Sequence, residues 1–518
     1  MATYGEKLAS SLTELKRLQA GKRLVIRSKE LSRTHLERLV DAGYLRQIVK
    51  GWYMPGRPDE HDGDTTTWFA SIKDFVRGYC DDRFGVDWYV NAETSLLLLT
   101  GSTTLPRQIL INAKKGNNNN LSLPAGSSLW DYTAKDFAPP ELRTEAQSLR
   151  VLKLEAALIR AAPNLWRADP LTMRLAMSQL TDVTDLSRLL LDGGRSVVAG
   201  RLAGAFDALA KPQFANELVA GMVAAGHVVN KTNPFEVPVE PLLPRPESPY
   251  CGRIRAMWNE MRADILVEWK LPQRETVPVD QYIDEAEDRY VTDAYHSLSI
   301  EGYRVTPELI EKVRKNNWEP EAKDKDDYNA MAARGYYEAH LEVLKSVRSV
   351  LDGENAGDVL RKELPAWYRA LWGPSLRAGV FKPSDLAGWR SWPIFIRNSE
   401  HVPLPPEAVR DAMPVLFELL SNEPEPSVQA VLGHFVFVFI HPYMDGNGRL
   451  ARFILNLMLS RGGWPWTIVT MKSRKQYMAA LEEASVRKNI KPFTKVISDL
   501  VQQQLTLPPT DRAIAPPV

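Results

Sequence analysis

The sequence predicts a mainly α protein, and three observations support that prediction. From residue 250 onward, apolar residues recur almost throughout at the three- and four-residue spacing of a helix, with one interruption near residues 389–399. The same spacing recurs in shorter segments between residues 147 and 229. Near the N-terminus, leucines stand at positions 8, 12, 15 and 18, which lie on one side of a helix. Strand-like segments are few and short, so helices should dominate the fold.

The length and composition are those of a globular protein with several domains. The chain has 518 residues, of which 44% are hydrophobic and 25% are charged. These values suggest about three or four domains and exclude a disordered, collagenous or coiled-coil chain. Lys and Arg number 65 against 64 Asp and Glu, a net charge of +1. Any attraction to nucleic acid or to a membrane must therefore come from a local patch.

Cysteine usage and the apolar runs bear on the compartment. The two cysteines, Cys80 and Cys251, fit no metal-ligand or Cys-x-x-Cys spacing, which favours a reduced compartment. The N-terminal residues lack the apolar core of a signal peptide. The longest apolar run, residues 435–440, is far shorter than the ~20 residues that cross a bilayer. We expect a cytoplasmic, soluble protein that does not bind membranes.

Residues 1–57 form a basic first domain. This block contains 12 Lys and Arg against 5 Asp and Glu. Ser32 is placed to cap a helix that would end at Gly43. Residues 44–48 and 52–54 then suggest two short strands. Helices followed by a hairpin form the order of a winged helix-turn-helix.

Such a domain could dock DNA or another protein, and the sequence leaves both possibilities open. In the DNA interpretation, Arg33 and Thr34 lie in the recognition helix, and Arg38 and Lys50 lie near phosphates. Duplex DNA is accordingly one candidate partner of residues 1–57.

Residues 58–235 are expected to form a mixed, mostly helical domain. Residues 91–100 resemble a buried helix and residues 108–112 a strand. The polar stretch 114–120 contains four consecutive Asn and predicts an exposed loop. A proline-rich linker should follow at 236–249, and the tail 506–518 is expected to be disordered.

One short segment concentrates residues suited to phosphate chemistry. An apolar helix should end at His441, because Pro442 disfavours helical backbone in the residue before it. The turn at residues 446–448 then feeds a second helix, and a glycine-rich turn before a helix N-terminus binds anions. Arg449 and Arg452 would emerge from one face there and suit a polyphosphate chain. Asp445 is a ligand suited to Mg²⁺, and His441 can act as a general base.

The run from His441 to Arg452 resembles the motif of the Fic family, His-Pro-Phe-x-(Asp/Glu)-Gly-Asn-Gly-Arg-x-x-Arg. The one departure is Tyr443 in place of Phe, at a position expected to pack inward. The resemblance implies a helical Fic core within residues 250–505. It also implies a nucleotide-binding run comprising Asp445, Gly446, Asn447, Gly448, Arg449, Leu450, Ala451 and Arg452.

Three further stretches resemble parts of Fic proteins. Ile394, Phe395, Ile396 and Arg397 resemble the β-hairpin flap that clamps a target side chain. Tyr477 and Met478 resemble the helix beside the adenine pocket, although the family often has a second Tyr where Met478 stands. Ser297, Glu301 and Gly302 match the family's inhibitory motif, on a helix expected at about residues 285–301.

The resemblance implies transfer of AMP from ATP, with Mg²⁺, to a Tyr, Thr or Ser hydroxyl of a target protein or of the chain itself. Pyrophosphate would be released, His441 would take the hydroxyl proton, and Glu301 would inhibit by pairing with Arg452. The intact turn at 446–448 argues against the kinase-like branch of the family, which replaces its second half.

The sequence leaves other functional interpretations open. Phosphocholine transfer and AMP removal share the motif. The first block and residues 92–111 vaguely resemble AbiEi-type antitoxins, which suggests a DNA-binding regulator or a toxin–antitoxin protein with a regulatory Fic site. The sequence also leaves open a homodimer and the identity of the target.

Overall fold

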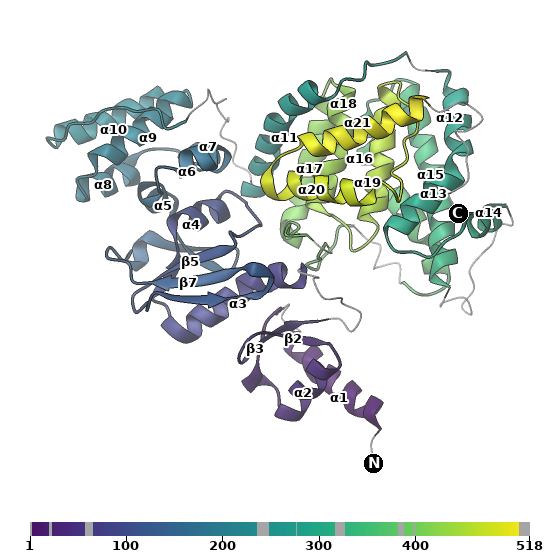
Figure 1. The fold of residues 1–518 in the computed structure, drawn as a ribbon. Helices are drawn as coiled ribbons and strands as arrows, with labels where there is room; N and C mark the ends of the chain where they lie inside the picture. The colour runs from purple at the N-terminus through teal and green to yellow at the C-terminus, as the bar shows by residue number, and fades with distance from the viewer. Residues whose placement is uncertain are drawn as a thin grey trace. The chain divides into compact units, whose positions relative to one another are not determined.

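Two units organise the chain in the computed structural model. It describes residues 3–19, 23–56, 66–235, 248–275, 277–315, 327–381, 388–396 and 399–506. One unit comprises Met1–Ala256 with Phe395–Val402, and the other comprises Met257–Ile394 with Pro403–Val518. All the strands of the described ranges lie before residue 153. In the described part of the second unit, helices are therefore the regular secondary structure (Figure 1). The predicted mainly α fold is confirmed.

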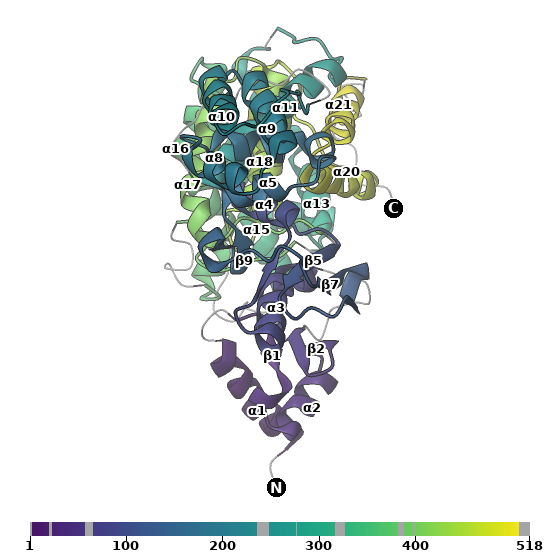
Figure 2. The ribbon, with the colours of Figure 1, turned by 90° about the vertical axis from the view of Figure 1, so that its left-hand side faces the viewer.

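The N-terminal elements follow the predicted order. The side chain of Ser32 accepts a hydrogen bond from the backbone of His35 at 3.3 Å, as expected of a helix cap, and Gly43 has a φ of +77°. Helices α1 and α2 lie side by side next to a three-stranded sheet of order β1-β3-β2 (Figure 2). The winged helix-turn-helix assignment stays a prediction. The elements are α1 (Tyr4–Gln19), β1 (Ile26–Arg27), α2 (Arg33–Asp41), β2 (Leu45–Val49) and β3 (Trp52–Pro55).

The middle segment joins a four-stranded sheet, of order β4-β5-β7-β6, and a hairpin, β8–β9, to a group of helices. The buried helix and the strand predicted near residues 91–112 are present as α4, capped by the Asn91 side chain, and β5. The strands are β4 (Trp88–Val90), β5 (Gln108–Ala113), β6 (Asn119–Ser122), β7 (Ser128–Tyr132), β8 (Arg143–Ala146) and β9 (Leu149–Leu152). The helices are α3 (Thr66–Phe84), α4 (Ala92–Leu99), α5 (Leu154–Arg160), α6 (Leu165–Ala168), α7 (Pro170–Ser178), α8 (Thr184–Asp192), α9 (Ser196–Ala208) and α10 (Pro212–Ala224).

Two predictions in this segment are corrected. The Asn-rich stretch is not all loop, because Asn119 and Asn120 pair with β7 in strand β6. An edge strand faces solvent along one side and therefore accepts polar residues. The helices predicted between residues 147 and 229 begin only at Leu154. Gln147 and Ser148 instead form the turn of the β8–β9 hairpin, with positive φ of +49° and +69°.

The second unit is a helical bundle built around α18. Every residue of α18 except Val438 is buried, which explains why this helix is apolar on all sides. It packs against α19, and α15 packs against α16 (Figure 1). The helices are α11 (Pro249–Glu268, which begins in the first unit), α12 (Val279–Asp288), α13 (Tyr290–Ile300), α14 (Pro307–Lys315), α15 (Tyr328–Leu351), α16 (Ala356–Arg377), α17 (Pro406–Asn422), α18 (Pro426–Ile440), α19 (Asn447–Arg461), α20 (Arg474–Arg487) and α21 (Lys491–Thr506).

Two expectations differ from the structure here. The helix expected at about 285–301 is divided at Arg289, whose buried guanidinium donates to the Trp466 carbonyl at 3.0 Å. The hairpin expected over 389–399 forms no strand among described residues 388–396. Instead, the backbone N–H of Arg390 donates a hydrogen bond to the Pro442 carbonyl at 2.9 Å. Arg397, most of the linker and residues 507–518 lie outside the described residues.

Candidate active site

The loop between α18 and α19 creates the site. Helix α18 stops at His441, which adopts a left-handed conformation (φ 55°, ψ 64°) ahead of Pro442. Gly446, with a φ of +85°, is the N-cap of α19. The first backbone N–H groups of α19 have no partner within the helix, and the helix dipole makes this end positive. The loop therefore delivers an imidazole and an anion-binding helix end to the same place.

His441 is oriented by a backbone carbonyl. Its Nδ1 lies 3.1 Å from the carbonyl oxygen of Val438. The tautomer with a proton on Nδ1 donates to that oxygen and leaves Nε2 as the nitrogen that can take up a proton. This is the arrangement that a general base requires.

The loop is rigid because its polar groups bond to one another. The Asn447 side chain accepts from the Tyr443 N–H at 2.9 Å and donates to the Tyr443 carbonyl at 2.7 Å. The Tyr443 ring is buried and stacks on Tyr368 with centroids 3.8 Å apart, so the position packs inward as expected. The side-chain amide of Asn447 therefore holds the loop together.

Arg390 has a positioning role that the sequence did not predict. Its Nε donates to the His441 carbonyl at 2.7 Å, and its other nitrogens donate to the carbonyls of Trp392 and Leu404. Burial lowers the pKa of Arg390 to about 10. The sequence carries no signal for this role of Arg390, because its hydrogen-bond partners are all backbone carbonyls.

Arg449 is buried, with 1% of its surface exposed, between two aromatic rings. Its guanidinium carbon lies 5.2 Å from the Tyr303 ring and 4.9 Å from the Trp372 ring. None of its three side-chain nitrogens has a hydrogen-bond partner among the described residues. The Asp445 carboxylate lies 3.7 Å away and is 65% exposed. A buried cation with open donors is suited to an anionic ligand.

Arg452 is joined to the helix before the core. It donates from Nε to the Ser297 hydroxyl at 2.8 Å and from Nη2 to the Glu301 carboxylate at 2.7 Å. A Cβ atom placed on Gly448 would lie 2.3 Å from the Glu301 carboxylate oxygen. The carboxylate therefore lies directly against the first turn of α19, where only glycine leaves it room. The structure thus brings Ser297, Glu301 and Arg452 together, with Gly302 just beyond at a φ of +91°.

The charges around Arg452 set the ionisation of its neighbours. Burial raises the pKa of Glu301, but the Arg452 guanidinium, aided by Arg449, outweighs burial and leaves that pKa below its ordinary value. Two turns earlier on α13, burial raises the pKa of Asp293 to about 6, although Tyr336 and Trp466 donate hydrogen bonds to it. At neutral pH the pair of Glu301 and Arg452 is ionised.

Other predicted nucleotide-binding residues are distributed differently. The side chains of Leu450 and Ala451 are fully buried, and their assignment to the nucleotide-binding run stays a prediction. Tyr477 is 1% exposed, and its hydroxyl lies 2.7 Å from His434 Nε2, whereas Met478 is 37% exposed. Of the three described flap residues, only Ile394 belongs to the unit of the site.

The DNA-contact residues also separate into two groups. Thr34, Lys50 and Arg33 are exposed, and Arg33 pairs with Glu37 at 2.7 Å. Arg38 instead donates to the Lys7 carbonyl and the Ser11 hydroxyl, both at 2.9 Å, and so joins α2 to α1. These bonds favour a structural role for Arg38 over the predicted phosphate contact.

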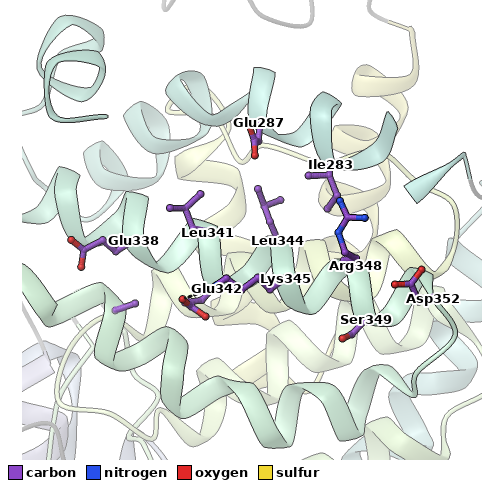
Figure 3. Close-up of a pocket in the computed structure, with 11 residues that line it drawn as sticks. Ile283, Glu287, Glu338, Leu341, Glu342, Leu344, Lys345, Arg348, Ser349 and Asp352 are labelled. Carbon is purple, nitrogen blue, oxygen red and sulfur yellow. Dashed lines mark hydrogen bonds and ion pairs between the residues drawn. The ribbon is translucent and has the colours of Figure 1, made fainter. Parts of the chain in front are cut away.

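A separate cavity of about 600 Å³ lies between α12, α15 and α16 (Figure 3). Glu287 reaches it from α12, while Glu342 and Lys345 reach it from α15 and form an ion pair at 2.7 Å. None of the predicted site residues lines it.

Comparison with known proteins assigns the segment around this loop. Residues 363–459 match the model of the Fic/DOC family. The chain contains a Fic domain. A protein adenylyltransferase Fic from Nematostella vectensis is 29% identical over 234 residues, which cover 44% of this chain and 50% of that protein. Its counterpart from Drosophila mojavensis is also 29% identical, over 42% of this chain and 41% of that protein. The chain thus spans half or less of these relatives.

Solved structures of Fic proteins also align with the chain. Fic-1 from C. elegans aligns with a TM-score of 0.35 and 16% identity, over 65% of this chain and 97% of that one. A Fic domain containing signaling protein from Bacteroides thetaiotaomicron aligns with a TM-score of 0.33 and 18% identity, over 50% and 96%. Separately, none of the helices in the described ranges has an apolar stretch long enough to cross a bilayer.

Proposed function

We propose that the Fic domain transfers AMP from ATP to a hydroxyl side chain of a target protein or of the chain itself. One observation supports this most directly: two buried guanidinium groups, Arg449 and Arg452, flank the glycine-bounded N-terminus of α19, with His441 at its edge. The names of the relatives, adenylyltransferases from Nematostella vectensis and Drosophila mojavensis, support the same reaction.

In this mechanism the chain positions the reactants and stabilises charge. His441 Nε2 removes the proton from a Tyr, Thr or Ser hydroxyl as its oxygen bonds to the α-phosphorus. The bond from that phosphorus to the bridging oxygen of pyrophosphate breaks in line. The N–H groups of Asn447 and Gly448 lie at the helix end where the α-phosphate gains charge. Arg449 and Arg452 steady the remaining phosphates.

Asp445 fits a magnesium site at the edge of the loop. Its carboxylate is 65% exposed and accepts only the Gly446 N–H among its described hydrogen bonds. Magnesium in nucleotide enzymes is commonly held by one or two carboxylates together with substrate phosphates. Asp445 would hold the ion, which when bound neutralises phosphate charge.

Glu301 would inhibit the reaction by holding Arg452. The ion pair of 2.7 Å engages the guanidinium that a γ-phosphate needs, and the carboxylate stands against Gly448. ATP would then bind with its phosphates out of line. Removal of AMP at the same site is the alternative that also uses Glu301.

The proposed reaction is tested with ATP labelled at either end of the phosphate chain. We expect label from α-labelled ATP, and none from γ-labelled ATP, on the protein itself or on lysate proteins. Transfer of the γ label would indicate a kinase. Transfer of neither label, by the unaltered chain and by Glu301→Gly alike, would contradict the proposal.

The basic N-terminal block supports a second, compatible role in binding duplex DNA. Its exposed Arg33 and Lys50 stand on α2 and next to the β2–β3 turn. The chain would then bring the Fic site to DNA-associated targets, or act as a regulator of the toxin–antitoxin type. Cytoplasmic location and a homodimer stay predictions.

A further inference from the structure

Four buried donor nitrogens of two neighbouring side chains near Gly446 have no hydrogen-bond partner among the described residues. They are the indole Nε1 of Trp372 and the three side-chain nitrogens of Arg449. Trp372 comes from α16 and is 9% exposed, and Arg449 is 1% exposed. Nearly all buried donors in folded proteins are hydrogen-bonded, because leaving one unpaired destabilises the fold. Four at one place indicate a ligand that the described chain does not supply.

The donors of both residues border the same space. A Cβ atom placed on Gly446 would lie 3.4 Å from Trp372 Nε1 and 3.6 Å from Arg449 Nη2. Leu371 Cδ2 would lie nearer still, at 2.8 Å, so this methyl group and the two donors together surround the glycine. This is the N-cap of a 15-residue helix, whose dipole favours negative charge.

A second anion position lies two residues further along the chain, at Gly448. There the Glu301 carboxylate is held by Arg452 and lies against Gly448. A single carboxylate or chloride ligand would satisfy only one of the two positions. A chain of linked phosphates presents anionic oxygens at both.

We propose that Trp372 is a phosphate-binding residue: its indole N–H and the Arg449 guanidinium donate to oxygens of one phosphate group of the nucleotide. Tyr303 acts as a positioning residue on the other ring contact of Arg449, 5.2 Å from the guanidinium carbon. The two aromatic rings contact the guanidinium, whose nitrogens have no hydrogen-bond partner among the described residues. This inference rests on the proposed nucleotide-binding function.

The test compares Trp372→Phe with Trp367→Phe, both in the Glu301→Gly chain so that Glu301 does not compete. Trp367 lies five residues earlier on α16, is buried, and donates to the Ser346 hydroxyl at 3.0 Å. Each substitution removes one indole N–H from α16. The N–H of Trp367 has a protein partner, and the N–H of Trp372 has none among the described residues. The measurements are calorimetric affinities for ATP and for adenosine, and the melting temperature without nucleotide.

We expect Trp372→Phe to weaken ATP binding about tenfold, the usual effect of losing a hydrogen bond to a charged group, and to leave adenosine binding unchanged. Its melting temperature should fall less than that of Trp367→Phe, because both variants lose indole packing but only Trp367→Phe loses a protein hydrogen bond. Trp367→Phe should show the reverse pattern, a lower melting temperature with unchanged ATP affinity.

Unchanged ATP affinity in Trp372→Phe would overturn the inference, as would an equal loss of ATP and adenosine affinity. A fall in its melting temperature that matches Trp367→Phe would also overturn it, because the indole would then have a protein partner. A chain that binds ATP but transfers no AMP would contradict the proposed function and leave this comparison valid.

Discussion

The Glu301 carboxylate lies 2.7 Å from the Arg452 guanidinium and against Gly448, at the N-terminus of α19. The carboxylate is 28% exposed and the guanidinium is 3% exposed, so water screens their attraction only weakly. The Glu301 carboxylate, at the C-terminal end of α13, thus already lies at the N-terminus of α19, a position suited to phosphate. This relationship gives the first prediction.

Glu301→Gly should raise self-labelling from α-labelled ATP roughly 10- to 100-fold. Charge-assisted pairs contribute about 1.5–3 kcal/mol, and 1.4 kcal/mol corresponds to about tenfold in an equilibrium. Removing the carboxylate should populate the competent phosphate pose by that factor. Total ATP affinity should change much less, since ATP also binds in the unproductive pose.

The matched control is the double variant Glu301→Gly with Arg452→Ala. It should lose most of the gain, because the released guanidinium is missing. If Glu301→Gly labels no faster than the unaltered chain, Glu301 is not inhibitory, and a role in AMP removal becomes the better explanation.

His441→Ala should abolish AMP transfer while ATP binding persists. The imidazole acts on the attacking hydroxyl, whereas the phosphates are held by α19 and its two arginines. General-base catalysis contributes roughly 10²- to 10⁴-fold, so labelling should fall by at least about a hundredfold. Labelling time courses and calorimetry check the two halves of this prediction. Undiminished labelling would remove His441 from the mechanism.

Asp293 should make stability depend on pH. Burial raises the pKa of this carboxyl to about 6, against about 3.9 in an unfolded chain. Between these values the folded state holds a proton that the unfolded state has lost. The stabilisation is therefore complete below about pH 4 and is lost as pH rises through 6, by about 3 kcal/mol in total.

The measurement is the melting temperature of Asp293→Asn relative to the unaltered chain between pH 4 and pH 8. The variant has no proton to lose, so its relative melting temperature should rise across this range. Asp284→Asn, an exposed carboxylate on α12, should show no such trend. A constant difference for Asp293→Asn would contradict the assigned cause.

Local signals predicted the centre of the site well. The apolar run before His441, the proline after it and the glycines at 446 and 448 each act on their own backbone, and the structure has the helix, the break and the second helix that they predict. The placement of Ser297 and Glu301 on one helix face followed from their four-residue spacing.

The residues that complete the site were not predictable in the same way. Trp372 precedes Gly446 by more than 70 residues and looks like any apolar position of α16. Arg390 bonds to backbone carbonyls, which leave no trace in the sequence of their residues. The hairpin predicted over 389–399 was wrong for its described residues. Arg390 there bonds to distant backbone carbonyls, and the described residues 388–396 form no strand pairing.

The last prediction concerns the basic block at residues 1–57. If Arg33 and Lys50 contact phosphates, the full chain should bind duplex DNA with an affinity that falls steeply with salt, because each neutralised phosphate releases a counterion. Arg33→Ala and Lys50→Ala should each reduce the slope of log affinity against log salt by about one. Arg38→Ala is the matched control: its guanidinium already donates to Lys7 and Ser11, so it should lower the melting temperature and leave the slope unchanged. Binding that is absent at low salt, or insensitive to salt, would mean that this surface contacts protein instead.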